Sequence, residues 1–98
     1  MLVIGGTFEI DSTRRDDFIA AAIVVMAATR AEEGCEHYAF SADLEDQGRI
    51  HLFERWTSQE ALAQHLQSAH IAEFRESVAG IFISSSVLKY GVDSEGPI

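Results

Sequence analysis

The sequence has few basic residues and one cysteine, and these shortages exclude several classes of protein. Seven lysines and arginines stand against 16 aspartates and glutamates, which gives a formal net charge of −9. A surface of this sign repels nucleic-acid phosphates and anionic lipid headgroups, so we expect neither nucleic acid nor a membrane as a partner. The single thiol, Cys35, cannot close an internal disulfide, and no spacing of cysteine and histidine indicates a zinc site.

Long apolar runs are also missing. The longest apolar stretch, 18–28, is too short to span a bilayer, and the first ten residues lack the basic and apolar segments of a signal peptide. We therefore expect a cytoplasmic protein. A chain of 98 residues has room for one domain, and its 47% hydrophobic content is ordinary for a globular one. The pattern predicts a domain over 1–91 and a C-terminal tail over 92–98.

The periodicity of apolar residues predicts four strands and three helical segments. We expect strands at 2–10, 37–44, 49–56 and 81–90, and helices at 14–33, 58–68 and 71–78. Gly34 predicts the end of the first helix, and Thr57 with Glu60 forms a capping-box pattern at the start of the second. The order is that of a ferredoxin-like β-α-β-β-α-β fold of the α+β class, with its helices on one face of an antiparallel sheet.

Apolar residues occupy both faces of the predicted sheet. They occur as adjacent pairs on three strands: Val3 and Ile4, Leu52 and Phe53, Val87 and Leu88. A monomer would expose the face without helices as a large apolar patch, which soluble monomers avoid. We therefore expect a homodimer that forms through the open face of the sheet.

His65 is the most informative single position. Helical spacing places it on one stripe with Leu62, Leu66 and Ala69, and this stripe must face the sheet. Two interpretations stay open for an inward histidine. It can be a core residue bonded to a backbone carbonyl, or it can line a cavity and exchange a proton near neutral pH.

Glu54 and Trp56 are further candidates because they share a strand face with core residues. A carboxylate there needs a partner, and we consider Arg55 of the other subunit, His65 or a ligand; the alternative is a salt bridge at the strand end. In a continuous helix, His70 would lie about 140° from His65. The two histidines would then share a ligand only if the chain bent between them, so we expect no metal site.

Two motifs together resemble the antibiotic biosynthesis monooxygenase family. The first is the sequence EGC, at positions 33–35, followed by Tyr38. The second is the pattern E-x-W-x-S…A-L-x-x-H-x-x-S-x-H, which runs from Glu54 to His70. With the predicted order of strands and helices, the resemblance covers nearly the whole chain.

The resemblance implies a dimeric α/β barrel in which each subunit holds a pocket between helices and sheet. Members of the family include cofactor-free monooxygenases of anthrones or quinols, a haem-degrading branch and an isomerase of a phosphorylated sugar. In the oxygenases, an electron-rich phenol loses a proton and its anion reacts directly with O₂. Carried onto this chain, the resemblance implies His65 as the catalytic proton acceptor. It implies a substrate pocket formed by Tyr38, Glu54, Trp56, His70 and Phe74.

Departures from the family pattern narrow the expected activity. The chain has no asparagine, so the Asn-containing sites of the anthrone and haem-degrading branches cannot be completed, and its single lysine suits a phosphosugar poorly. We therefore expect a monooxygenase that needs no cofactor and oxidises a small quinol-like or phenolic aromatic with O₂. The alternatives are a dimer that binds a small molecule without turnover, and a non-oxidative isomerase on the same scaffold.

Overall fold

The strands pair as their alternating sequences predict. In the computed structural model, which describes residues 1–98, β1 (Leu2–Ile10) lies between β3 (Arg49–Trp56) and β4 (Phe82–Gly91). β2 (Cys35–Ala42) pairs with the other side of β3, and all pairs are antiparallel. The order β2-β3-β1-β4 confirms the ferredoxin-like α+β fold.

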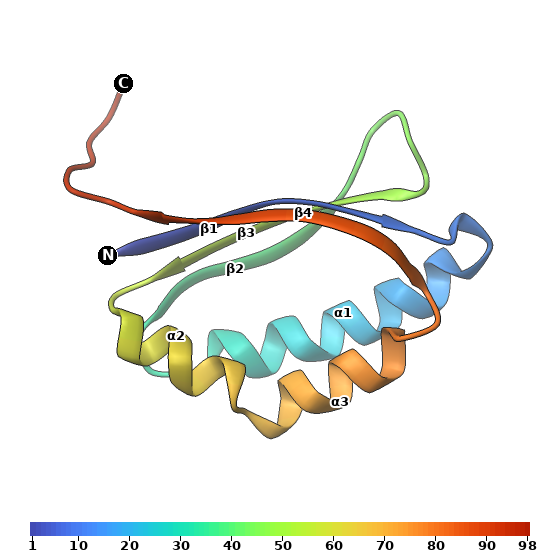
Figure 1. Ribbon diagram of the computed structural model, residues 1–98, viewed down its shortest axis with the longest axis horizontal. Coiled ribbons are helices and arrows are strands. Elements are labelled where there is room, and N and C mark those ends of the chain that lie inside the picture. Colours follow the sequence, from blue (N-terminus) through green and yellow to red (C-terminus); the bar gives the residue numbers. More distant parts are fainter.

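Three helices cover one face of this sheet and leave the other face bare (Figure 1). They are α1 (Arg15–Arg30), preceded by the short 3₁₀ turn η1 (Ser12–Arg14), α2 (Gln59–Leu66) and α3 (Ala69–Val78). None of them is long and apolar enough to cross a membrane. α1 ends three residues earlier than predicted, because residues 31–34 form a turn that leads directly into β2.

Serine side chains set the starts of the two later helices. The hydroxyl oxygen of Ser58 accepts a hydrogen bond from the backbone N–H of Ala61 at 3.1 Å, and Ser58 has extended backbone angles. The predicted capping role of Thr57 is wrong, because the next residue, Ser58, is the N-cap, while the backbone N–H of Thr57 bonds to the carbonyl of Gly34 at 2.9 Å. Ser68 caps α3 in the same way, so the chain is interrupted between α2 and α3.

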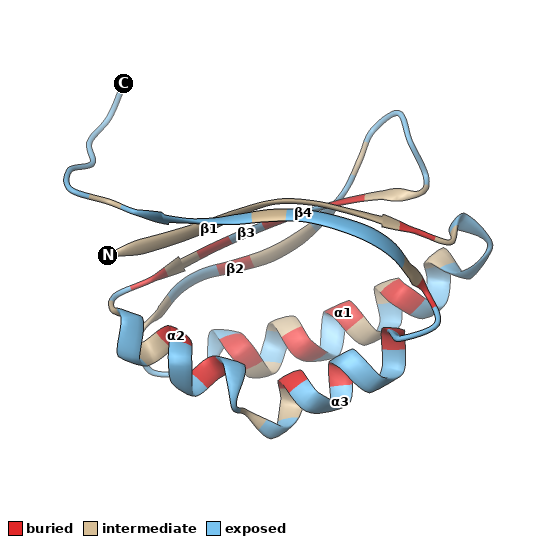
Figure 2. Ribbon diagram, viewed as in Figure 1, coloured by how far each residue is buried: buried red, intermediate tan, exposed pale blue.

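The core lies mainly over β2 and β3. Alternate residues of β3 are buried under the helices, whereas no residue of β4 is buried (Figure 2). On the same side of the sheet, the residues of β1 that lie between them, Ile4, Gly6 and Phe8, are only half-buried. The helices therefore cover the two halves of the sheet unequally, and the half made by β1 and β4 has space above it.

The bare face of the sheet carries an apolar patch, as the sequence predicts. Phe53 is 44% exposed, Leu88 61% and Tyr90 50%. Phe53 and Leu88 lie on either side of Gly5, which pairs with both. The homodimer that would cover this patch stays a prediction.

Gly34 allows the tight connection between α1 and β2, and its replacement tests this part of the fold. Its φ of +86° lies in the left-handed region, and a Cβ at this position would lie 2.5 Å from Cβ of Ala61 and 2.9 Å from Oγ1 of Thr57. We expect Gly34→Ala to lower the free energy of unfolding by about 2 kcal/mol in urea denaturation. Gly91→Ala is the control, because a Cβ there has open space, and an equal loss in both variants would contradict this explanation.

Candidate active site

Glu32, which is partly buried, and His65, which is fully buried, form a hydrogen-bonded pair at the end of the helical layer. His65 is 2% exposed, and its Nδ1 lies 2.6 Å from Oε2 of Glu32. Since a carboxylate accepts hydrogen bonds, this contact holds the proton of a neutral imidazole on Nδ1 and leaves the lone pair on Nε2. The predicted inward position of His65 is confirmed. Leu66, predicted on the same stripe, is exposed because α2 ends there.

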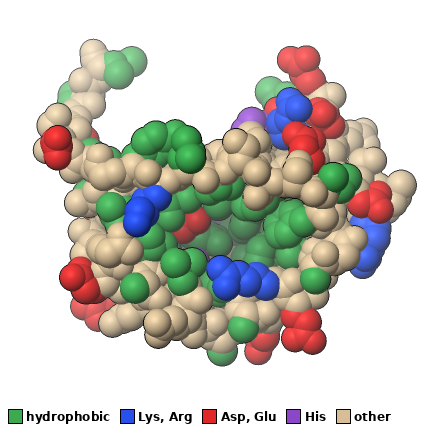
Figure 3. Space-filling model, in the orientation of Figure 1, with side chains coloured by type: hydrophobic (Ala, Val, Ile, Leu, Met, Phe, Trp, Pro, Cys, Tyr) green, Lys and Arg blue, Asp and Glu red, His purple; other side chains and the backbone are tan.

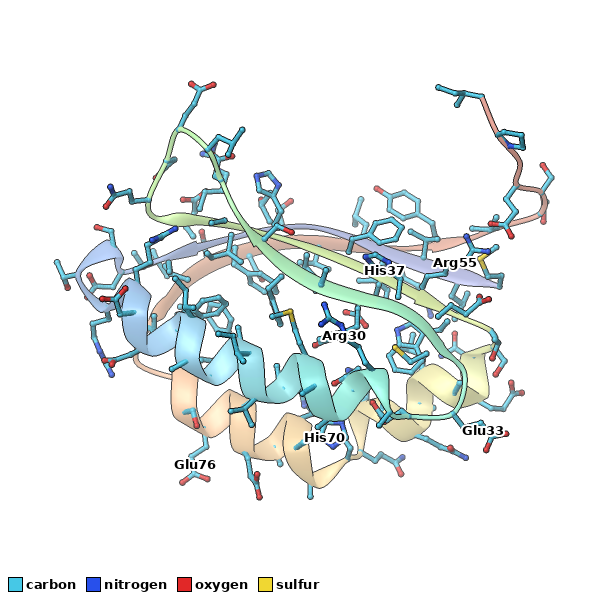
Figure 4. The ribbon with its side chains drawn as sticks, turned by 180° about the vertical axis from the view of Figure 1, so that it is seen from behind. Arg30, Glu33, His37, Arg55, His70 and Glu76 are labelled. Atoms are coloured by element: carbon cyan, nitrogen blue, oxygen red, sulfur yellow. The ribbon has the colours of Figure 1, made fainter.

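His70 joins this pair, which the sequence analysis did not expect. Its Nε2 lies 3.2 Å from the same Oε2 of Glu32, and the two imidazole rings are 6.1 Å apart. The expected separation of the histidines is wrong because it assumed a continuous helix. α2 ends at Leu66, and Ser68 starts a new helix whose first turn brings His70 beside α1 (Figure 4).

Two aromatic side chains from the sheet surround His65. The ring of Trp56 lies 4.7 Å from the imidazole and that of Tyr38 lies 5.3 Å away, and both residues are buried. The indole Nε1 of Trp56 donates a hydrogen bond to Oε1 of Glu54 at 2.8 Å. The buried Glu54 thus has its partner on its own strand. Arg55 points to the opposite face of the sheet, where it pairs with carboxylates of β2 and the C-terminal tail.

Phe74 lies apart from the imidazole of His65, in the aromatic part of the core. Its ring packs against those of Phe40, Phe18 and Phe82, at 5.4, 6.1 and 6.4 Å. It also lines, with His70, a pocket of about 140 Å³ between α1 and α3. Another pocket, of about 190 Å³, lies between α1 and the edge strand β2, where eight of its nine lining residues are hydrophobic. That second pocket has no acid or base in its wall.

Burial sets the ionisation of this cluster. It lowers the pKa of His65 below its ordinary value, with partial compensation from the bond to Glu32. It raises the pKa of Glu54, an effect that the Trp56 hydrogen bond reduces and the charge of Glu32 increases. Burial and the charge of Glu54 also raise the pKa of Tyr38. At neutral pH the site therefore holds a neutral imidazole and a protonated phenol.

Glu32, His65 and His70 also have the donor atoms of a metal site. The ligand atoms of all three lie within 4.8 Å of one another. Two imidazoles and one carboxylate suit a first-row transition-metal ion. The same contacts equally describe a carboxylate that orients two imidazoles by hydrogen bonds, so the expectation of no metal stays a prediction.

A hollow opens between β4 and the two helices α2 and α3 (Figure 3). Figure 3 shows it lined by hydrophobic side chains, with acidic atoms in its depth and basic side chains at its upper and lower rims. Glu54 is the acidic residue of the sheet that faces the helices. The hollow corresponds to the half of the sheet that the helices cover least.

Sequence reasoning missed Glu32 and Lys89. The buried stripe of α1 runs through Phe18, Ala22, Val25 and Thr29, and helical spacing extends it to position 32, so this signal was available. Lys89 lies in one cross-strand row with Ile4, Glu54 and Tyr38. Only the register of the strands reveals this row.

Comparison with known proteins agrees with the fold and the motifs. The family model described as "Antibiotic biosynthesis monooxygenase" matches residues 1–77. The chain belongs to this family. Since the match covers well over half of the chain, the predicted family resemblance is confirmed.

Relatives with similar sequences are found in bacteria. A protein of Synechocystis is 26% identical over 88 residues, which cover 90% of this chain, and the aligned part spans 60% of that protein's length. YcnE of Bacillus subtilis, whose name proposes a monooxygenase, is 24% identical over 76% of this chain and 78% of its own.

Solved structures of similar fold extend over the whole domain. Rv0793 of Mycobacterium tuberculosis is 27% identical, covers 98% of both chains and superimposes with a TM-score of 0.87. A Deinococcus radiodurans protein, named as a proposed antibiotic biosynthesis monooxygenase, is 21% identical, covers 100% of this chain and 98% of its own, and has a TM-score of 0.91. At 21% identity this second likeness establishes the fold alone.

Replacement of Glu54 tests the effect of burial on its charge. Glutamine can accept the same hydrogen bond from Trp56 without a buried charge, so we expect Glu54→Gln to raise the free energy of unfolding at pH 7 by about 1 kcal/mol. Because the pKa of Glu54 is raised in the folded state, the native protein takes up its proton first as the pH falls, and the gain should shrink towards pH 5.

Urea denaturation at both pH values measures this difference. Glu73→Gln is the matched control on the exposed surface of α3, and it should change the unfolding free energy little at either pH. A gain for Glu54→Gln that did not depend on pH would contradict the assignment to a buried charge.

Proposed function

We propose that this chain is a monooxygenase that oxidises a quinol-like aromatic with O₂ and needs neither metal nor flavin. The observation that carries the proposal is the Glu32–His65 pair, in which His65 is buried against the rings of Trp56 and Tyr38. Membership of the antibiotic biosynthesis monooxygenase family supports the reaction class. The role of each residue below belongs to the proposal.

His65 takes the proton of a substrate hydroxyl in this mechanism. With its Nδ1 proton directed at Glu32, the imidazole accepts the phenolic proton at Nε2. The imidazolium that forms is stabilised by the carboxylate, as in other carboxylate–histidine pairs. Tyr38 and Trp56 pack against the imidazole of His65 from the sheet side and restrict its position.

The deprotonated substrate then supplies all the electrons that O₂ requires. The quinol anion attacks O₂ through a ring carbon and forms a carbon–oxygen bond. The resulting peroxide takes back a proton, its O–O bond breaks, and one oxygen leaves as water while the other stays on the ring. Oxidation of the ring C–H to a hydroxyl and of the quinol to a quinone provides four electrons together, so the reaction needs no external reductant.

His65→Gln tests the proton acceptor. We expect oxygen uptake with a reduced naphthoquinone, corrected for autoxidation without protein, to fall by about a hundredfold or more. His51→Gln is the matched control, because His51 lies on the opposite face and bonds to Asp43. Burial lowers the pKa of His65, so wild-type activity should rise with pH and reach its plateau below the ordinary pKa of histidine. The charged or titratable groups that act on the ring are Glu32, His70 and Arg75. Equal rates in His65→Gln and wild type would remove the mechanism.

Treatment with a strong chelator separates this reaction from metal catalysis. We expect the chelated and dialysed protein to keep its full rate of oxygen uptake. A loss that zinc, iron or copper restored would contradict a cofactor-free reaction and would point to the Glu32–His65–His70 trio as a metal centre. Turnover without O₂ would favour the isomerase alternative, and tight binding of aromatics without any product would favour a binding protein.

The proposed assembly is a homodimer formed through the bare face of the sheet. The apolar patch around Phe53, Leu88 and Tyr90 supports it, because a second copy related by a two-fold axis would cover both patches at once. α1 offers a competing surface, since Ile23 is 59% exposed on its outer side.

Two charge substitutions distinguish these surfaces. We expect sedimentation analysis to find a dimer for the wild-type chain and a monomer for Phe53→Glu, because two carboxylates would be buried at the interface. Ile23→Glu introduces the same charge on α1 and should remain a dimer. A monomeric wild-type protein, or dissociation by Ile23→Glu alone, would contradict the proposed interface.

A further inference from the structure

The hollow between β4 and the helices α2 and α3 has walls of different chemistry. Its floor is the half-buried side of β1 and β4, where Ile4, Gly6 and Val87 face the helices. Because Gly6 has no side chain and Val87 is only partly covered, a planar apolar group could lie over these strands. An apolar floor of this kind is suited to an aromatic ring.

The rim of the hollow contains two cations that have no carboxylate partner. Three of the other basic residues, Arg14, Arg49 and Arg55, form ion pairs with aspartates or glutamates. Lys89 of β4 forms none and donates only to the neutral Oε1 of Gln59 at 3.1 Å, which places its ammonium group against the start of α2. Arg75 of α3 forms no ion pair either, although the chain carries 16 acidic residues.

The remaining two arginines, Arg15 and Arg30, belong to α1. Arg30 donates to the backbone carbonyl of Tyr38 at 3.0 Å and lies between α1 and β2 (Figure 4). Arg15 has a buried Nε at the start of α1. Arg75 of α3 and Lys89 of β4 are thus the lysine and arginine residues on the elements that border the hollow in Figure 3.

Of the two cations, Arg75 acts on the proposed proton acceptor, whereas Lys89 lies on the opposite edge strand of the sheet from Tyr38. Lys89 lies in the same cross-strand row as Glu54 and Tyr38. The positive charge of Arg75 is near enough to lower the pKa of both Tyr38 and His65. An anionic group held at this rim would leave the ring attached to it over the apolar floor.

We propose that this hollow binds a hydroxylated aromatic that carries a carboxylate, with the carboxylate at the rim formed by Arg75 and Lys89. The inference rests on the proposed function, because it takes the aromatic ring and its hydroxyl from that reaction and adds the anionic substituent. Charge-assisted hydrogen bonds from arginine and lysine are the usual means of holding such a group.

Calorimetry with a matched pair of probes tests the anionic substituent. The probes are 6-hydroxy-2-naphthoate and 6-hydroxy-2-naphthamide, which have nearly the same shape and differ in charge. We expect the carboxylate to bind about tenfold more tightly, and its advantage to fall as salt is added. Arg75→Gln and Lys89→Gln should each reduce the affinity for the carboxylate severalfold without changing that for the amide, and the double variant should remove the preference.

Arg14→Gln is the control for the loss of one positive charge, because Arg14 lies at the far end of the chain's helical layer and pairs with Asp17. Equal affinity for the two probes, no binding of either, or an equal loss in Arg14→Gln would overturn the proposal. Tighter binding of 2-naphthyl phosphate than of the carboxylate would overturn the choice of carboxylate. Because binding requires no turnover, a protein that preferred the carboxylate to the amide but took up no oxygen would contradict the proposed reaction and support the proposed class of ligand.

Discussion

One carboxylate oxygen of Glu32 holds together three segments of the helical layer. It contacts His65 at the end of α2 and His70 at the start of α3, and Glu32 itself follows the end of α1. Because these contacts are short and largely buried, the loss of any one partner would leave a charge or a polar ring without compensation. The position of the candidate base therefore depends on the same interaction that joins the helices.

The electrostatics of the site follow from this arrangement. The charge of Glu32 adds to the cost that burial imposes on ionising Glu54, and burial keeps His65 neutral. Such a site keeps the lone pair of His65 free at neutral pH and has little positive charge of its own. The cations that could hold an anionic group lie at the rim, on Arg75 and Lys89, where water can solvate them until a ligand replaces it.

The sequence predicted those features that follow a regular period. The bounds of β1 and β3 agree with the alternation of apolar residues, and His65 lies inward as its helical stripe indicates. The proximity of His70 could not be predicted from a helical wheel, since Ser68 interrupts the helix through a single cap. The cross-strand row that contains Lys89 could not be found without the register, because its members come from four different strands.

Most residues of the family motif serve the architecture rather than the reaction. Ser58 and Ser68 begin helices, and Ala61 packs so closely on Gly34 that position 34 has no room for a side chain. The hydrogen bond that Trp56 donates offsets part of the free-energy cost of burying Glu54. Only the two histidines retain ring nitrogens without a partner inside the chain. The motif can therefore identify the family while leaving the substrate open, and the choice of substrate falls to residues outside it that face the hollow.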